Sequence, residues 1–113
     1  MTEDQLLSAV VELAKFAGFK VCHFRPARTE KGWRTAVQGH KGFPDVIIAG
    51  HTRFIVAEVK TAQGSLTDEQ ARWRLELDRA GVEYHLWRPQ DWDEGTIARE
   101  LGCEGAEIPR RHP

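Results

Sequence analysis

Apolar side chains near the start of the chain recur every three or four residues, which is the spacing of one face of a helix. Thr2 is a residue type favoured at the helix N-cap, and Gln5, three residues later, completes a capping box. Gly18 supplies a stop signal at the other end. The pattern therefore predicts a helix from the start of the chain to about Ala17.

Two short runs of β-branched and other apolar residues, at 46–49 and 53–57, predict a β-hairpin. If His51 and Thr52 are the two turn residues, the numbers of each facing pair sum to 103. Both faces of this hairpin carry apolar side chains, so we expect other elements to cover both faces.

A second helix is predicted between Thr67, another favourable N-cap, and about Ala80, with Gly81 as its stop. The inward stripe of this helix is Leu66, Gln70, Trp73 and Leu77. We expect Trp73, Leu75 and Leu77 to lie in the core. The amide of Gln70 has two interpretations, since it stands at the capping-box position and also faces inward, toward any site beneath the helix.

The other segments complete one α/β domain over residues 1–103. We predict strands at 20–25 and 83–87, a long loop at 26–43, a short helix over 93–101 and a loose polar tail at 104–113. No internal repeat is present.

Composition narrows the class of protein. The 113 residues are 41% apolar and 29% charged, which is ordinary for a globular domain. No apolar run is long enough to span a membrane, and the acidic start does not resemble a signal peptide. Cys22 and Cys103 lack metal-ligand spacing, so we expect reduced thiols and a cytoplasmic protein.

The net charge of −1 conceals an uneven distribution. Residues 20–43 hold six Lys or Arg against one acid, a balance of +5, whereas residues 91–107 hold six acids against one Arg, a balance of −5. Phe24 and Trp33 interleave the basic stretch, a composition that suits a nucleic-acid backbone with base stacking. The alternative is a solvated loop that balances the acidic tail. The candidate phosphate contacts are Arg25, Arg28, Lys31, Arg34 and Lys41.

The predicted hairpin register places two acids opposite each other. Asp45 faces Glu58, with Cβ atoms roughly 4.5–5.5 Å apart, and Lys60 projects from the same face as Glu58. Facing carboxylates near the end of a buried sheet repel each other, so a metal ion, a proton or a cationic partner must compensate. Oxygen ligands suit a hard divalent cation. A salt-bridge cluster with Lys60 remains the alternative.

Helical phase separates two further acids. Glu3 lies on the inward stripe with Leu7, Val10, Ala14 and Ala17, whereas Glu12 lies on the polar face. Glu3 is therefore a candidate to approach the Asp45 and Glu58 pair, although a first-turn carboxylate favoured by the helix dipole is the simpler interpretation. The five histidines show no metal-binding helical spacing, and no Gly-rich phosphate loop follows a strand.

These motifs resemble a known family. Pro44-Asp45, Glu58-Val59-Lys60 and Gln70 resemble the signature of the PD-(D/E)XK nuclease superfamily. The fuller string is similar to the virus-type replication-repair nuclease domain (VRR-NUC), and the similarity spans roughly residues 2–98. That string comprises Gly42-Phe43-Pro44-Asp45, Glu58-Val59-Lys60-Thr61, Gly64-Ser65-Leu66-Thr67, Glu69-Gln70 and Trp73, with Thr2-Glu3 at the start and Gly81 after the second helix.

The resemblance implies a restriction-endonuclease-like α/β core, a mixed central sheet of about four strands flanked by helices. It implies Mg²⁺, or Mn²⁺ as a substitute, bound by Asp45, Glu58 and the Val59 backbone carbonyl, with Glu3 completing the set directly or through water. Lys60 would orient the attacking water or stabilise the phosphorane, and Gln70 would position water or phosphate.

The implied reaction is hydrolysis of DNA phosphodiesters that leaves a 5′-phosphate and a 3′-hydroxyl. Stand-alone relatives resemble Holliday-junction resolvases, act as homodimers and serve phage or bacterial replication, repair and recombination. Two other hypotheses remain open: a catalytically silent nucleic-acid-binding module on the same scaffold, and a metal-binding or regulatory protein that does not bind nucleic acid.

Overall fold

The structure, a computed structural model, describes residues 1–24, 27–34 and 37–103. The predicted tail at 104–113 lies outside the described residues. The elements are α1 (Glu3–Phe16), β1 (Lys20–His23), β2 (Ala27–Thr29), β3 (Gly32–Arg34), β4 (Val46–Gly50), β5 (Arg53–Val59), α2 (Asp68–Arg79), β6 (Glu83–Trp87), α3 (Pro89–Asp93) and α4 (Thr96–Glu100).

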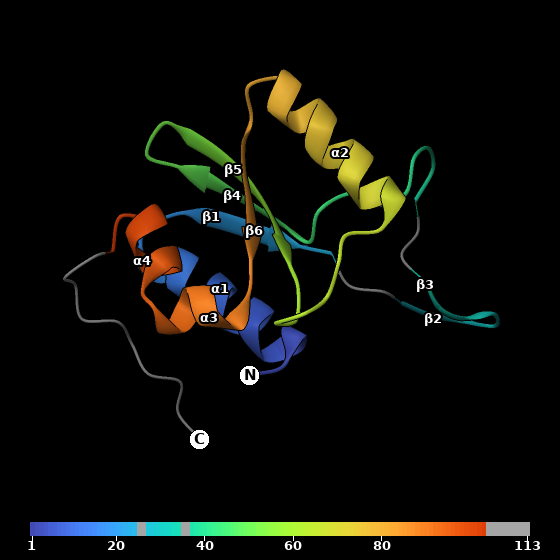
Figure 1. Ribbon diagram of the computed structural model, residues 1–113, viewed down its shortest axis with the longest axis horizontal. Coiled ribbons are helices and arrows are strands. Elements are labelled where there is room, and N and C mark those ends of the chain that lie inside the picture. The colour runs from blue at the N-terminus through green and yellow to red at the C-terminus, as the bar shows by residue number, and fades with distance from the viewer. Residues whose placement is uncertain (25–26, 35–36, 104–113) are drawn as a thin grey trace.

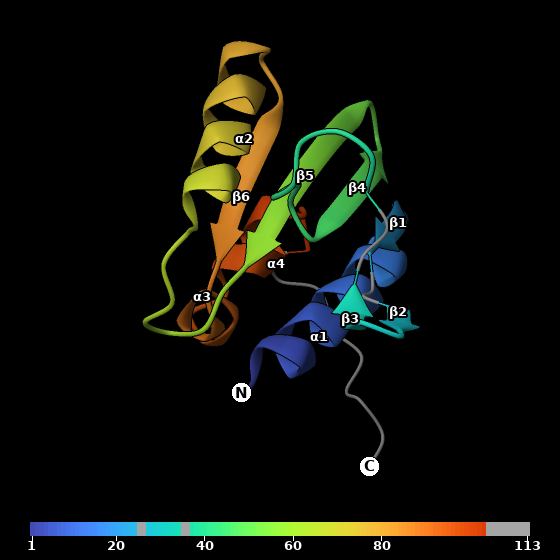
Figure 2. The same ribbon diagram turned by 90° about the vertical axis from the view of Figure 1, so that its right-hand side faces the viewer.

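The central sheet has four strands in the order β1-β4-β5-β6. The pairs β1–β4 and β4–β5 are antiparallel, while β5–β6 is parallel and is connected through α2. Helices α1, α3 and α4 lie on one side of the sheet and α2 lies on the other (Figures 1 and 2). The expected α/β class, a mixed four-stranded sheet flanked by helices, is confirmed.

The predicted hairpin register is also confirmed. Val46 faces Ala57 and Gly50 faces Arg53, so the facing numbers sum to 103. His51 and Thr52 have φ angles of 50° and 62°, the left-handed values of the two-residue turn that matches strand twist. The Nε2 atom of His51 lies 2.8 Å from the carbonyl oxygen of Ala17, which ties the turn to the end of α1.

The core lies between α1 and one face of the sheet. Five residues of α1 are buried, and the alternate residues of β4 and β5 that face them are buried as well. Trp87 of β6 and the α4 region close this layer. The buried set on this side includes Leu6, Val10, Leu13, Ala14, Val46, Ile48, Ile55, Ala57, Val59, Trp87, Ile97 and Leu101.

The opposite face is covered less completely than the pattern predicts. Phe54 is 49% exposed, and Ile47 and Ala49 are only half-buried, because α2 packs chiefly on β6 and leaves the hairpin turn uncovered. The phase of the α2 stripe is right, but no residue of α2 is buried. The expectation that Trp73, Leu75 and Leu77 lie in the core is wrong, since Leu75 is 48% exposed and the other two are only half-buried and lie outside the core cluster.

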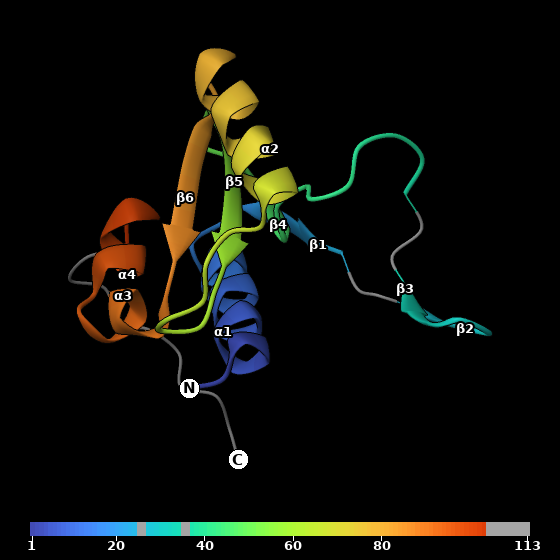
Figure 3. The same ribbon diagram turned by 45° about the vertical axis from the view of Figure 1, so that its right-hand side comes forward.

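Two segment predictions need correction. The stretch 26–43 is not a plain loop, because β2 and β3 form a hairpin that Gly32, at φ 99°, helps to turn; Figure 3 shows this hairpin projecting away from the body. The single helix predicted over 93–101 is divided into α3 and α4. Pro89 begins α3 early, and Gly95, in the left-handed region at φ 77°, separates the two helices.

Both predicted capping boxes are present, at Thr2–Gln5 and at Thr67–Gln70. Both cysteines are free, Cys22 exposed and Cys103 buried. Within the described ranges, the helices are too short or too polar to cross a lipid bilayer.

Candidate functional site

Two acids from adjacent strands meet at one end of the sheet. Asp45 immediately precedes β4, and Glu58 is the second-last residue of β5, so the antiparallel register brings them together. The Oδ2 atom of Asp45 accepts a hydrogen bond from the Val59 backbone N–H at 2.9 Å. Glu58 is 2% exposed and is the one charged side chain buried within the described part of the chain.

The negative charge of the buried Glu58 carboxylate is only partly offset by the positive charge near it. Burial is the main cause that raises the pKa of Glu58 to about 8; the neighbouring Asp45 carboxyl contributes to the rise, while Lys60 opposes it. The Oε2 atom of Glu58 is buried and has no hydrogen-bond partner among the described residues. His23 Nδ1 on β1 is the other such atom. A buried carboxylate oxygen in this state is costly unless a proton or cation joins it.

Gln70 satisfies both interpretations of its position. Its Oε1 accepts from the Thr67 N–H at 2.9 Å, and its Nε2 donates to Glu58 Oε1 at 3.1 Å. The capping box therefore orients the amide, and the amide in turn orients the carboxylate. Lys60 Nζ lies 4.0 Å from the same Oε1 atom, so the Lys60 amine and the Gln70 amide both lie near one oxygen of Glu58.

Glu3 reaches the same end of the sheet from the first turn of α1. Glu3 is exposed rather than buried on the inward stripe, but partial desolvation raises its pKa, and so does the negative charge of Asp45, while Lys60 lowers it. These influences place Glu3 within electrostatic range of the two acids, whereas Glu12, which is also exposed, is not among the groups that shift the pKa of Glu58. The described residues contain no group of three His, Cys, Asp or Glu side chains close enough to hold one ion.

The residues present fit a small hard cation. Asp45 and Glu58 offer carboxylate oxygens, one of them buried without a partner, and Val59 adds a backbone carbonyl at the end of β5. Mg²⁺ accepts such a set, because it binds through one or two carboxylates and keeps several waters.

Two further residues shape the site without having been predicted to do so. Arg88 donates from Nη1 to the carbonyl oxygens of Thr61 and Gly64, both at 2.7 Å, and so holds the turn that follows Lys60. A Cβ atom on Gly42 would lie 2.8 Å from the backbone nitrogen of Gln70, so only glycine allows the loop before Asp45 to touch α2. Only the motif position of Gly42 gave a sequence signal.

The predicted basic contacts are placed only in part. Arg25 lies outside the described residues, and Arg28 and Arg34 are placed only as backbone positions of β2 and β3. Lys31 is exposed between these strands, and Lys41 is exposed near the start of α2.

A second charged cluster occupies the core face of the sheet and is fully paired. Arg53 donates to Glu83 at 2.6 and 3.1 Å and to the Glu100 carbonyl at 2.7 Å. His85 contacts Glu83 through Nε2 and Glu100 through Nδ1. Trp87 Nε1 also donates to Glu100. The hydrogen bond from Arg53 lowers the pKa of Glu83.

Comparisons with known proteins bear on the fold. No family model matches the sequence, and no curated protein matches it. One solved structure described as a VRR_NUC domain is 17% identical, with a TM-score of 0.61 over 85% of this chain and 96% of the other. A second, a VRR_NUC domain protein, is 19% identical, with a TM-score of 0.63 over 98% and 97%.

A third similar structure is the Holliday junction resolvase Hjc from Archaeoglobus fulgidus, at 21% identity over 74% of this chain and 67% of that one. Its TM-score of 0.44 is below those of the two VRR_NUC structures. The matches to the two VRR_NUC structures cover most of this chain and nearly all of the other chain in each case. They confirm the expected fold. The chain therefore has the fold of VRR-NUC domain proteins.

Proposed function

We propose that this protein is a VRR-NUC nuclease that hydrolyses DNA phosphodiester bonds with a divalent cation. The observation that carries the proposal is Glu58, a buried carboxyl with an unpartnered oxygen, held against Asp45 and beside Lys60. A structural ion pair would leave no oxygen of this kind, whereas a cation site requires one. The VRR-NUC fold supports the same assignment.

In this proposal Asp45, Glu58 and the Val59 carbonyl would hold Mg²⁺, or Mn²⁺ as a substitute, and Glu3 would complete the set directly or through water. Such an ion would supply a water of lowered pKa and positive charge next to the scissile phosphate. Asp45 is held in place by the Val59 N–H, and Glu58 by the Gln70 amide. Each ligand is therefore oriented by a neighbour before the ion arrives.

Lys60 acts on the phosphate. Its ammonium group lies 4.0 Å from Glu58 Oε1, and the side chain as a whole is 14% exposed, so Lys60 is close to the acids and still accessible to a bound strand. There it stabilises the negative charge that develops on the phosphorane or orients the attacking water. Arg88 is a positioning residue, because it fixes the turn next to Lys60 without reaching the acids in the described structure.

A cleavage assay tests the proposal. Wild-type protein with Mg²⁺ should cut at least one of three DNA substrates, a four-way junction, a flap or a linear duplex, and leave a 5′-phosphate and a 3′-hydroxyl. Asp45→Ala and Lys60→Ala should bind DNA but cut it at least about 10²-fold more slowly than wild type. Salt-sensitive binding by wild type without cutting would support a silent binding module instead, and neither binding nor cutting would contradict both.

A second test uses the proton on Glu58. Because the pKa of this carboxyl is about 8 without metal, Mg²⁺ binding at pH 7 must displace a proton. Calorimetric titration in two buffers of different ionisation enthalpy should reveal that release, and Glu58→Gln should abolish it.

The finer parts of the proposal rest on the sequence resemblance. We propose branched DNA as the preferred substrate, a homodimer as the active form, and a role in the cytoplasm of a bacterium or a phage-infected cell. Analytical ultracentrifugation that shows only monomer at working concentration would remove the dimer.

A further inference from the structure

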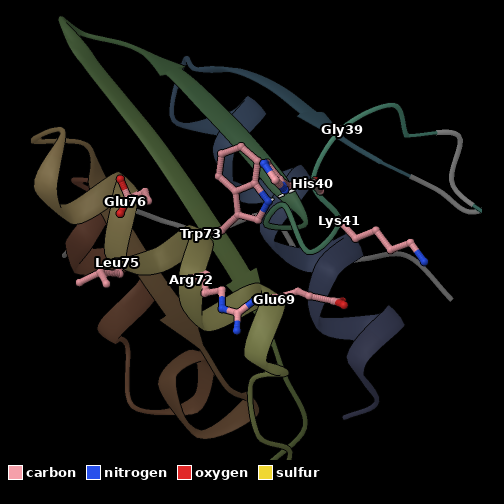
Figure 4. A pocket seen from close by; sticks show the side chains of 8 residues that line it. All are labelled: Gly39, His40, Lys41, Glu69, Arg72, Trp73, Leu75 and Glu76. Carbon is pink, nitrogen blue, oxygen red and sulfur yellow. Dashed lines mark hydrogen bonds between the residues drawn. The ribbon is translucent and has the colours of Figure 1, made fainter.

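A pocket lies beside the acids, between the loop at 39–41 and the outer surface of α2. Its volume is about 560 Å³, within the range of roughly 300–1,000 Å³ typical of small-molecule sites. Figure 4 shows the indole of Trp73 at the centre of the lining residues, with Lys41 on one side and Glu76 on the other. The lining residues are Gly39, His40, Lys41, Glu69, Arg72, Trp73, Leu75 and Glu76.

The indole is held in a fixed orientation. Phe43 packs against Trp73 edge-to-face with ring centroids 4.9 Å apart, and Phe24 packs on Phe43 at 6.0 Å. The Trp73 Nε1–H donates to the carbonyl oxygen of His40 at 3.3 Å, so the loop and the ring support each other. An aromatic ring that is ordered before binding loses little conformational entropy when a flat ligand stacks on it.

The charges around the indole indicate what kind of ligand the pocket accepts. Lys41 and Arg72 are opposed by Glu69 and Glu76, so the formal charge of the lining cancels. Within the described chain neither Glu69 nor Arg72 has a hydrogen-bond or ion-pair partner, whereas Glu76 pairs with Arg79 at 3.1 Å. Carboxylates repel a phosphate, but a carboxylate and a guanidinium together match the donors and acceptors on the edge of a nucleobase.

Trp73 lies one helical turn from Gln70, the residue that contacts Glu58. Trp73 follows Gln70 by three residues on the same face of α2, and Gln70 donates to Glu58. Gly42, which follows the pocket loop, contacts the backbone at Glu69 and Gln70. A strand whose phosphate lies at Asp45 and Glu58 therefore has a neighbouring base within reach of the indole.

We propose that this pocket binds one unpaired nucleobase of the DNA strand, stacked on Trp73 and bonded at its edge by Glu69 and Arg72. The inference rests on the proposed nuclease function and makes it more specific, since it selects DNA that has an unstacked base close to the cut. Fully paired duplex offers no such base without the cost of unstacking it.

The test is direct binding without catalysis. A single-stranded tetranucleotide that carries 2-aminopurine is titrated with protein in a chelator, and its fluorescence is followed. Wild type should quench the probe, and Trp73→Ala should bind it about tenfold more weakly or worse, because base–aromatic stacking has that magnitude. Trp73→Phe keeps a ring against Phe43 and should stay within about threefold of wild type.

Two controls isolate the base. Phe54→Ala removes an exposed aromatic ring that lies outside the pocket and should leave binding unchanged. The same oligonucleotide with an abasic position has every phosphate but no base, so wild type should bind it about tenfold more weakly. Equal affinity for the two oligonucleotides would overturn the proposal, and this comparison needs no variant that must fold.

The two proposals fail in different ways. If the protein is not a nuclease, Mg²⁺ produces no cutting while quenching by Trp73 persists. If the pocket is not a base site, wild type cuts DNA while Trp73→Ala cuts single-stranded and branched substrates at the wild-type rate.

Discussion

Two clusters of acidic side chains lie on opposite faces of one sheet, and their carboxyl groups are held in opposite ways. In the cluster of Arg53, Glu83, His85 and Glu100, the Arg53 guanidinium lowers the pKa of Glu83. In the cluster of Asp45 and Glu58, burial and the neighbouring acid raise the pKa of Glu58 to about 8. In the first cluster the negative charge of Glu83 is balanced by Arg53, and we call this cluster complete. In the second cluster the negative charge is balanced only when a cation or a proton is added, and we call this cluster incomplete.

This difference distinguishes a structural ion pair from a binding site. Both clusters contain acids on β-strands beside a basic residue, and sequence spacing alone does not separate them. What separates them is that Arg53 makes two hydrogen bonds to Glu83, whereas Lys60 stays 4.0 Å from Glu58. A paired acid stabilises the fold, while an under-compensated acid lowers stability and is retained for another purpose.

The largest effect is expected from removing the charge of Asp45, which leaves Glu58 without a facing carboxylate. Asp45→Asn should lower the Mg²⁺-dependent cleavage rate by at least about 10²–10³-fold, because a ligand charge is lost. Its melting temperature without metal should not fall, since repulsion with Glu58 is relieved. Retained cleavage, or a large loss of stability, would mean that Asp45 belongs to a structural pair.

Lys60→Ala should reduce the cleavage rate by about 10²-fold, as expected for one group that stabilises the transition state. The free energy of unfolding should change little, because Lys60 forms only a long contact with Glu58. Single-turnover kinetics measure the rate, and Lys60→Arg is the matched variant that keeps the charge.

In the complete cluster, Arg53→Ala should lower the free energy of unfolding by about 1–3 kcal/mol, the loss expected when hydrogen bonds between charged groups are broken. Cleavage at a temperature where the variant is folded should match wild type. Chemical denaturation measures the first effect. Full stability with loss of cleavage would reverse the roles assigned to the two clusters.

The pH dependence sharpens the contrast. The pKa of Glu58 is raised from 4.5 to about 8, so the folded protein binds this proton more tightly than the unfolded chain. The stability from this carboxyl is present below pH 4.5 and is lost as the pH rises through about 8. Mg²⁺ should therefore raise the melting temperature more at pH 8 than at pH 6. Glu58→Gln should flatten the metal-free profile and abolish the Mg²⁺ effect, as thermal denaturation can show.

The smallest expected effect separates two acids of α1. Glu3→Gln should reduce cleavage by about tenfold, the lower end of the losses seen when groups around a metal ligand are changed. Glu12→Gln, the matched control on the outer face, should have no effect. Measuring the cleavage rate as a function of Mg²⁺ concentration tests both variants. Equal losses would show that helical phase does not determine which acid of α1 acts at the site.

Much of this molecule follows from short-range signals. The capping boxes at Thr2 and Thr67 form as predicted because each bond joins residues three apart. The turn at His51 and Thr52 determines the hairpin register, and the register alone brings Asp45 to Glu58. The sequence pattern did not reveal that the helix predicted over 93–101 is divided at Gly95, nor that β2 and β3 form a hairpin. Turns of this kind depend on backbone angles that many sequences permit.

The sequence by itself determined which residues cap, turn and converge, because each of those events depends on neighbours along one or two strands. Only the tertiary structure decided how far Glu58 is buried, that Gln70 reaches it, and that the loop at 39–41 forms a pocket on Trp73. Burial and electrostatic environment come from elements distant in the chain. No local pattern encodes the dielectric surroundings that α1, α2 and the sheet create together.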